Sequence, residues 1–141
     1  VTISRRAGNR LDLAFDLVWL AFAYGRVDRN EEAVRTAVQA LDLFRDVENP
    51  TGIALAFLDL AFLLTWRGRH GDAIRMAAVS EAVRRQAGGG PMPGFAGLLE
   101  GDPAAEARAH LSNEDAERAW TEGLGMTVDD AVALARQDID A

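Results

Sequence analysis

The chain of 141 residues contains no cysteine, no lysine and only four prolines. Without cysteine it has no disulfide, no thiolate metal ligand and no thiol nucleophile. Without lysine it lacks the residue that follows the glycines of a phosphate-binding loop, and Schiff-base chemistry is excluded as well. Alanine, leucine and arginine dominate the composition instead, which favours helices.

A basic excess is also missing, because all fifteen basic residues are arginine and the net charge is −7. Nucleic-acid-binding domains are normally basic, so we expect no direct binding to nucleic acid. Anionic membranes are disfavoured for the same reason. The two longest apolar runs, Leu17 to Tyr24 and Ile53 to Trp66, are shorter than the roughly twenty residues that span a bilayer. With no signal-peptide pattern, the sequence predicts a cytoplasmic location.

Apolar residues recur at helical spacing through most of the chain. We expect a single all-α domain over residues 1–141. Its expected parts are a first helix pair over 10–47, a second over 50–87, a glycine- and proline-rich loop over 88–103, and C-terminal closing helices over 104–141. The last two helices are short, and Trp120 is expected to anchor them onto the pairs.

Four polar residues mark expected helix starts. Asn30 and Asn49 precede apolar runs, and the proline after Asn49 fits the first position of a helix. Ser112 and Thr127 are each followed three residues later by an aspartate, a capping-box layout with aspartate in place of glutamate. We therefore expect helices to begin at these four residues.

The sequence matches itself when it is shifted by forty residues. Leu20-Ala21-Phe22 aligns with Leu60-Ala61-Phe62. The match continues with Arg29, Ala33, Arg35 and Ala37 over Arg69, Ala73, Arg75 and Ala77. Each copy is predicted to be a helix, a short turn and a second helix. Such a unit cannot bury its apolar face alone, so the copies must stack.

The two copies resemble tetratricopeptide repeats. That family places a large apolar residue, a leucine, a small residue and an aromatic residue on the first helix. The corresponding residues are Leu17, Leu20, Ala21 and Tyr24, and then Phe57, Leu60, Ala61 and Leu64. The period of forty is longer than the usual value of about thirty-four, and arginine replaces the closing proline. The resemblance covers about residues 11 to 87 and implies antiparallel helix pairs in an α-α superhelix.

The end of the chain resembles the closing segment of large bacterial regulators, the LuxR-type activators and signal-transduction ATPases. The similarity runs from Asp115 to Ala135 and includes Trp120 and Gly123. In that family the helical repeats follow an ATPase module. The resemblance implies that this chain is the C-terminal part of a bacterial regulator of transcription or signal transduction. The start at Val1 fits an excised piece, the alternative being a short protein trimmed at its N-terminus.

No combination of residues predicts catalysis. His70 and His110 lie on different segments without metal-ligand spacing, and the serines lack a nucleophile-elbow context. The acidic pairs near the C-terminus are expected to be solvated. The basic and aromatic cluster from Trp66 to His70 is expected to lie near a helix C-terminus, the alternative being contact with phosphate or an acidic partner. We therefore expect no enzyme, no metal site and no cofactor.

Asp59 interrupts the most apolar run of the chain. A buried carboxylate needs a partner, so one expectation is an ion pair with an arginine across a groove. The alternative is that Asp59 points to solvent on an open face.

These features predict a non-catalytic protein-interaction or scaffolding module. The groove positions of tetratricopeptide repeats, carried onto this chain, are Val18, Phe22, Arg26, Leu58, Phe62 and Trp66. These side chains are unusually apolar for an open face, so we expect the C-terminal segment, a second copy or a partner to cover them. The alternative is a small-molecule sensor in which the segment from Phe95 to Leu99 roofs the same groove.

The first helix is apolar around nearly its whole circumference, and such a helix is normally buried all round. The second helix covers only one side of it. We therefore predict a two-fold homodimer through the N-terminal helix, with Phe15, Trp19 and Phe22 in the contact. The alternative is a monomer in which residues 88–111 fold back over the exposed face.

Overall fold

The computed structural model describes residues 2–88 and 103–137 of the chain. Within these ranges it contains seven helices and no strand, so the expected all-α class is confirmed. The helices are α1 (Thr2–Arg26), α2 (Asn30–Asp46), α3 (Pro50–Trp66), α4 (His70–Gln86), α5 (Pro103–Arg108), α6 (Asn113–Leu124) and α7 (Val128–Ala135). None of the described helices is long and apolar enough to cross a bilayer.

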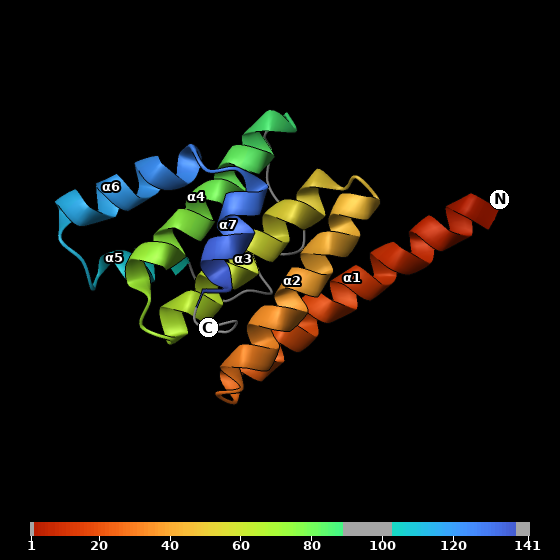
Figure 1. The fold of residues 1–141 in the computed structure, drawn as a ribbon, viewed down its shortest axis with the longest axis horizontal. Helices are drawn as coiled ribbons and strands as arrows, with labels where there is room; N and C mark the ends of the chain where they lie inside the picture. Colours follow the sequence, from red (N-terminus) through yellow and green to blue (C-terminus); the bar gives the residue numbers. More distant parts are fainter. Residues whose placement is uncertain (1, 89–102, 138–141) are drawn as a thin grey trace.

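The first four helices form two antiparallel hairpins, α1 with α2 and α3 with α4 (Figure 1). Their ends repeat the forty-residue period, since α2 and α4 span 30–46 and 70–86, and α1 and α3 end at residues 26 and 66. The turns repeat it too. Asp28 and Gly68 have φ angles of 61° and 80°, and Glu48 and Gly88 have φ angles of 51° and 107°. A period seen in the sequence is therefore also a period of the backbone.

Three of the four expected caps are present. The side chain of Asn49 accepts a hydrogen bond from the Gly52 amide at 2.8 Å. Ser112 and Thr127 accept from the amides three residues on, at 3.1 and 3.0 Å. Each side chain satisfies a backbone N–H that has no partner inside its own helix.

The expectation that Asn30 caps α2 is wrong. The cap position belongs to Arg29, which makes no side-chain capping hydrogen bond, and Asn30 is already helical. The reason is the turn before it. The Arg29 amide donates back to the Tyr24 carbonyl at 2.9 Å, and the Arg29 carbonyl accepts from the Ala33 amide at 2.9 Å. This closure ends α1 and starts α2 one residue earlier than expected.

Helix α1 begins at Thr2, well before the expected start near residue 11. Its first residues contain no proline and only one glycine, Gly8, so no residue there stops a helix. The early part of α1 projects beyond the end of α2, and the N-terminus lies at its tip (Figure 1). This overhang receives no cover from the second helix of its own pair.

The second pair packs on the first through α3, which contacts α1, α2 and α4. Small residues allow the close approach. A Cβ atom at Gly25 would lie 2.8 Å from the Trp66 ring, and one at Gly52 would collide with the Phe44 ring. Most of the α3 side chains are buried as a result, including Leu55, Phe57, Leu60, Leu63 and Leu64, all without exposed surface.

Helix α6 lies along α4 through Ala116, Ala119 and Gly123. A Cβ atom at Gly123 would lie only 2.5 Å from the carbonyl oxygen of Arg75, so the two backbones are nearly in contact. Trp120 is half-buried and packs against the hydrophobic core, with the Arg108 guanidinium 5.9 Å from its ring centre. Both Trp120 and the small residues that approach α4 most closely therefore contribute to the packing of α6.

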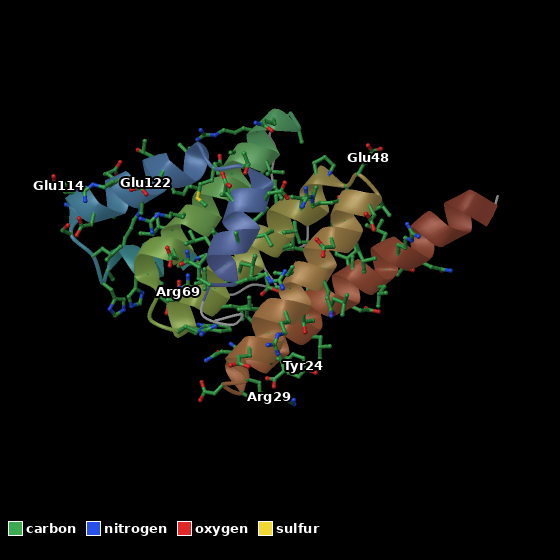
Figure 2. The ribbon with its side chains drawn as sticks, in the orientation of Figure 1. Tyr24, Arg29, Glu48, Arg69, Glu114 and Glu122 are labelled. Carbon is green, nitrogen blue, oxygen red and sulfur yellow. The ribbon has the colours of Figure 1, made fainter. Side chains whose placement is uncertain are left out.

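Helix α7 is held by two arginines from the hairpins. Arg45 of α2 forms an ion pair with Asp129 at 3.1 Å. Arg69, which precedes α4, donates to the Leu134 carbonyl at 2.9 Å and to the Ala135 carbonyl at 3.5 Å. These carbonyls end α7, where cations are favoured by the helix dipole. Figure 2 shows Arg69 close to the end of α7.

Candidate interaction surface on the first helix

The predicted groove is not open in this structure. Val18, Phe22 and Phe62 are almost completely buried, with 3, 8 and 2% of their surfaces exposed. The expectation that these side chains line an open face is corrected. Since Gly25 and its neighbours let α1 approach α3 directly, the side chains fill the contact between the two helices and offer little to a partner.

Three aromatic rings join α1 to α3 at this contact. The Phe22 ring centre lies 5.9 Å from that of Phe62 and 5.2 Å from that of Trp66, in edge-to-face arrangements. The guanidinium of Arg26 lies 5.3 Å from the Phe22 ring centre. Aromatic and cation–π contacts of this kind stabilise a fold by more than the burial of their apolar surface alone. Four of the six predicted groove residues are thus brought together, as a structural cluster at one edge of the contact.

The two remaining groove residues lie apart from this cluster. Val18 is buried earlier on α1, and Leu58 is half-buried on α3. Trp66, although it belongs to the cluster, keeps 36% of its surface exposed. The six residues predicted to line one groove are therefore divided between the buried core and its partly exposed edge.

The three residues predicted for self-association also separate. Phe15 packs edge-to-face on Phe44 of α2, with ring centres 5.0 Å apart, and Phe22 is buried against α3. Trp19 alone is exposed, over 40% of its surface. Phe15 and Phe22 therefore belong to the packing of the chain itself, whereas Trp19 remains available to a partner.

An apolar surface nevertheless lies on α1, on the side away from α2 and α3. Its large side chains are Leu13, Trp19, Leu20 and Val27, exposed over 49, 40, 42 and 64% of their surfaces. Exposed Asp12, Asp16 and Ala23 lie between them. We call these seven residues the outer face of α1. Trp66 is the other large apolar side chain that is similarly exposed in the described ranges.

Sequence reasoning missed most of this outer face. Leu13, Leu20 and Val27 are spaced by seven residues, which places them on one side of a helix after two turns each. This seven-residue spacing indicates the outer face in the sequence, but the apolar residues on the other sides of α1 make it hard to distinguish. Residues 103–108, part of the segment expected to fold back over α1, pack on α3 and α4 instead. Residues 89–102, including the expected roof from Phe95 to Leu99, lie outside the described ranges.

Neither expectation for Asp59 holds. Its side chain is fully buried, and neither carboxylate oxygen has a hydrogen-bond partner among the described residues. Leu55, Phe62 and Leu63, which share its side of α3, are buried with it. Removal from water disfavours the charged form, so burial raises the pKa of Asp59 well above its usual value of 3.8.

The two histidines meet although their sequence positions gave no sign of it. The His70 and His110 rings stack with centres 4.1 Å apart and planes 7° from parallel. Rings stacked face to face cannot direct their nitrogen lone pairs at one ion. No group of three or more histidine, aspartate or glutamate side chains with metal-binding geometry occurs among the described residues. The contact joins the start of α4 to the loop after α5.

The remaining polar candidates have structural roles. The Ser80 hydroxyl donates to the Ala54 carbonyl at 2.7 Å and so joins α4 to α3. Arg67 occupies the C-cap position of α3, near the helix C-terminus as expected, where its backbone amide donates to the Leu63 carbonyl at 3.2 Å. Arg69 reaches α7 instead. A hollow between α2 and α7 is lined mainly by charged and polar side chains: Arg35, Val38, Gln39, Asp42 and Arg136.

No protein family, curated protein or solved structure matches this chain.

Proposed function

We propose that the chain is a non-catalytic protein-interaction module that binds a protein through the outer face of α1. The observation that carries the proposal is the group of four large apolar side chains exposed together on that face. Isolated exposed apolar residues are ordinary, but a gathered set usually marks an interaction site. Completing the burial of one such side chain would contribute on the order of 1 kcal/mol.

The forty-residue period supports this reading of the outer face. Leu20 and Leu60 are equivalent, yet Leu20 is exposed over 42% of its surface and Leu60 is fully buried. Trp19 and Asp59 are also equivalent, and again the α1 residue is exposed whereas the α3 residue is buried. Helix α3 has extensive contacts with α1, α2, α4 and α5, whereas the extensive contacts of α1 with other described helices are those with α2 and α3. Within the described part of the chain, α1 therefore carries apolar side chains like those of the buried α3, but on one side they remain exposed.

The same proposal includes a tetratricopeptide-like arrangement of the two helix pairs. The matching helix ends, turn conformations and buried alanines of the two copies support it. It also includes a place near the C-terminus of a bacterial LuxR-type or signal-transduction ATPase regulator, supported by the sequence from Asp115 to Ala135. A cysteine-free composition suits the cytoplasm, where such regulators would act.

A photo-crosslinking amino acid at position 19 tests the proposal in cells that express the chain. We expect adducts with one or a few proteins, identified by mass spectrometry. The control carries the same amino acid in place of Glu114, whose side chain is 86% exposed on α6, far from α1 in Figure 2. It should give none of the same adducts. Protein adducts absent at position 19, or identical at both positions, would reject the outer face as a binding surface.

The small-molecule alternative is an outcome of the same experiment. A sensor domain would give a low-mass adduct at position 19 and no protein adduct. We favour a protein because the outer face is a row of side chains along one helix, which suits a second helix better than a small ligand.

A further inference from the structure

We infer that the occupant of the outer face of α1 is the α1 of a second copy of this chain, antiparallel to the first and related to it by a two-fold axis near Trp19. This inference rests on the proposed function, because it names the partner of the same surface. It also fixes the register of the two helices, which makes it testable residue by residue.

The apolar stripe supplies the first argument. Leu13, Leu20 and Val27 lie seven residues apart, and Asp16 and Ala23 fall between them on the same side of the helix. Two such stripes packed against each other form the seam of a two-helix coiled coil. The stripe lies opposite the α1 residues that are buried in the chain's own core, namely Ala14, Val18 and Ala21. A second helix can therefore lie along it without disturbing that core.

The charges supply the second argument, and they select the antiparallel direction. Asp12, Trp19 and Arg26 form a row beside the stripe, again spaced by seven residues and exposed. In an antiparallel pair this row meets its own copy in reverse order. Asp12 then lies opposite Arg26 of the second copy, and Trp19 lies opposite Trp19. Symmetry makes the Asp12–Arg26 contact twice.

A parallel pair would have the opposite electrostatics. The row of Asp12, Trp19 and Arg26 would face the opposite flank of the second copy, so Asp12 would not meet Arg26, while Asp16 in the stripe would lie opposite Asp16. Charges that flank a helical seam set the orientation of the partner in this way. The outer face is therefore complementary to itself in one direction only.

Charge reversal tests the register in the purified full chain by sedimentation equilibrium. Asp12→Arg and Arg26→Asp each replace two attractive contacts with two repulsive ones, so each should weaken dimerisation by about tenfold. The double variant restores both contacts and should dimerise within about threefold of the wild type. Glu114→Arg, a reversal on α6, should leave the dimer unchanged. Circular dichroism confirms that each variant is folded.

Three results would overturn the inference. The wild type stays monomeric up to its highest soluble concentration, the double variant is no tighter than the single ones, or Glu114→Arg weakens the dimer equally. A nitroxide label gives an independent readout, because the chain has no other cysteine. With Asn9→Cys, the antiparallel pair should place the two labels about 30 Å apart along the helix axis, from twenty residues at about 1.5 Å each. A parallel pair would bring them to about the interhelical spacing of 10 Å and contradict the inference.

Failure here is distinguishable from failure of the proposed function. If the purified chain is monomeric but position 19 captures a different protein in cells, the outer face is still a binding surface and the self-pairing is wrong. If the chain is monomeric and position 19 captures no protein, both are wrong.

Discussion

Asp59 lies forty residues after Trp19, at the equivalent position of the second helix pair, and the two residues have opposite environments. Trp19 is exposed over 40% of its surface, whereas Asp59 is fully buried and its carboxyl group has no hydrogen-bond partner in the part of the chain that the structure describes. At equivalent positions, α1 thus exposes an apolar ring and α3 buries a carboxyl group. Each of them costs free energy in the isolated chain, and each therefore gives a measurable prediction.

Asp59 should make the stability of the chain fall as the pH rises. Burial raises the pKa of Asp59 in the folded state well above the usual 3.8. In the pH window between the pKa of the unfolded state and that of the folded state, the folded chain therefore holds a proton that the unfolded chain has lost. Its contribution is fully present below about pH 4 and is lost as the pH rises through the folded-state pKa. Relative to the wild type, Asp59→Asn should gain about 1.4 kcal/mol in unfolding free energy per pH unit within that window.

Urea unfolding at several pH values measures this difference. The difference between Asp59→Asn and the wild type is needed because Glu81 gives the unfolding free energy a pH dependence of the opposite sign. The hydrogen bond from Arg84 lowers the pKa of Glu81. Asp42→Asn, at an exposed position on α2, is the matched control and should keep the wild-type pH dependence. A parallel pH profile for Asp59→Asn and the wild type would show that Asp59 is solvated or paired.

Gly123→Ala should destabilise the chain even though alanine favours helices. The new Cβ atom would lie 2.5 Å from the Arg75 carbonyl oxygen and 2.6 Å from the Ala78 Cβ atom, so α6 must move away from α4. We expect a loss of about 1–3 kcal/mol in thermal or urea unfolding. Gly8→Ala is the control, because its added Cβ would have nothing within 4 Å apart from the neighbouring backbone of its own helix, and it should stabilise by about 0.5–1 kcal/mol. Equal stabilisation by both changes would mean that α6 does not lie this close to α4.

Arg69→Ala should release α7, while Arg29→Ala should not. The two arginines are equivalent in the forty-residue period, but only Arg69 donates to the carbonyls at the end of α7. Arg29 instead lies over the Tyr24 ring at 4.8 Å and near Glu32 at 3.4 Å, and Figure 2 shows Tyr24 and Arg29 together at the turn after α1.

Amide hydrogen exchange over residues 128–135 measures the release. A hydrogen bond from a charged donor is worth about 1.5–3 kcal/mol, so Arg69→Ala should speed exchange there by about tenfold or more. Exchange that is unchanged in Arg69→Ala, or equally fast in Arg29→Ala, would show that α7 is held by other contacts.

The fold was predictable where local signals and periodicity agreed. The forty-residue match anticipated two copies of a helix, a turn and a second helix. The caps at Asn49, Ser112 and Thr127 were each recognisable from a few neighbouring residues. Asn30 misled because a good capping residue says nothing about the left-handed turn at Asp28 that starts the helix one residue earlier. The start of α1 was missed because polar residues without a stop signal are compatible with both helix and coil.

The candidate site was harder to predict because burial depends on contacts between distant helices. Phe22 and Trp19 look alike in the sequence, but only Phe22 faces α3 at the place where Gly25 lets the helices meet. The tetratricopeptide groove positions therefore pointed into a contact, and the exposed row of Leu13, Leu20 and Val27 lay on the other side of the same helix. Periodicity identifies an apolar face but does not say which neighbour covers it.

If the outer face of α1 is not covered by the chain itself, the Trp19 side chain is accessible to water. With Trp66→Phe and Trp120→Phe, Trp19 is the only tryptophan, and iodide quenching of its fluorescence measures its access to water. At low protein concentration we predict quenching well above that of a buried tryptophan, and a decrease in quenching as the concentration rises and the outer face becomes covered. Weak quenching that is independent of concentration would show that Trp19 is covered by its own chain and would contradict the account.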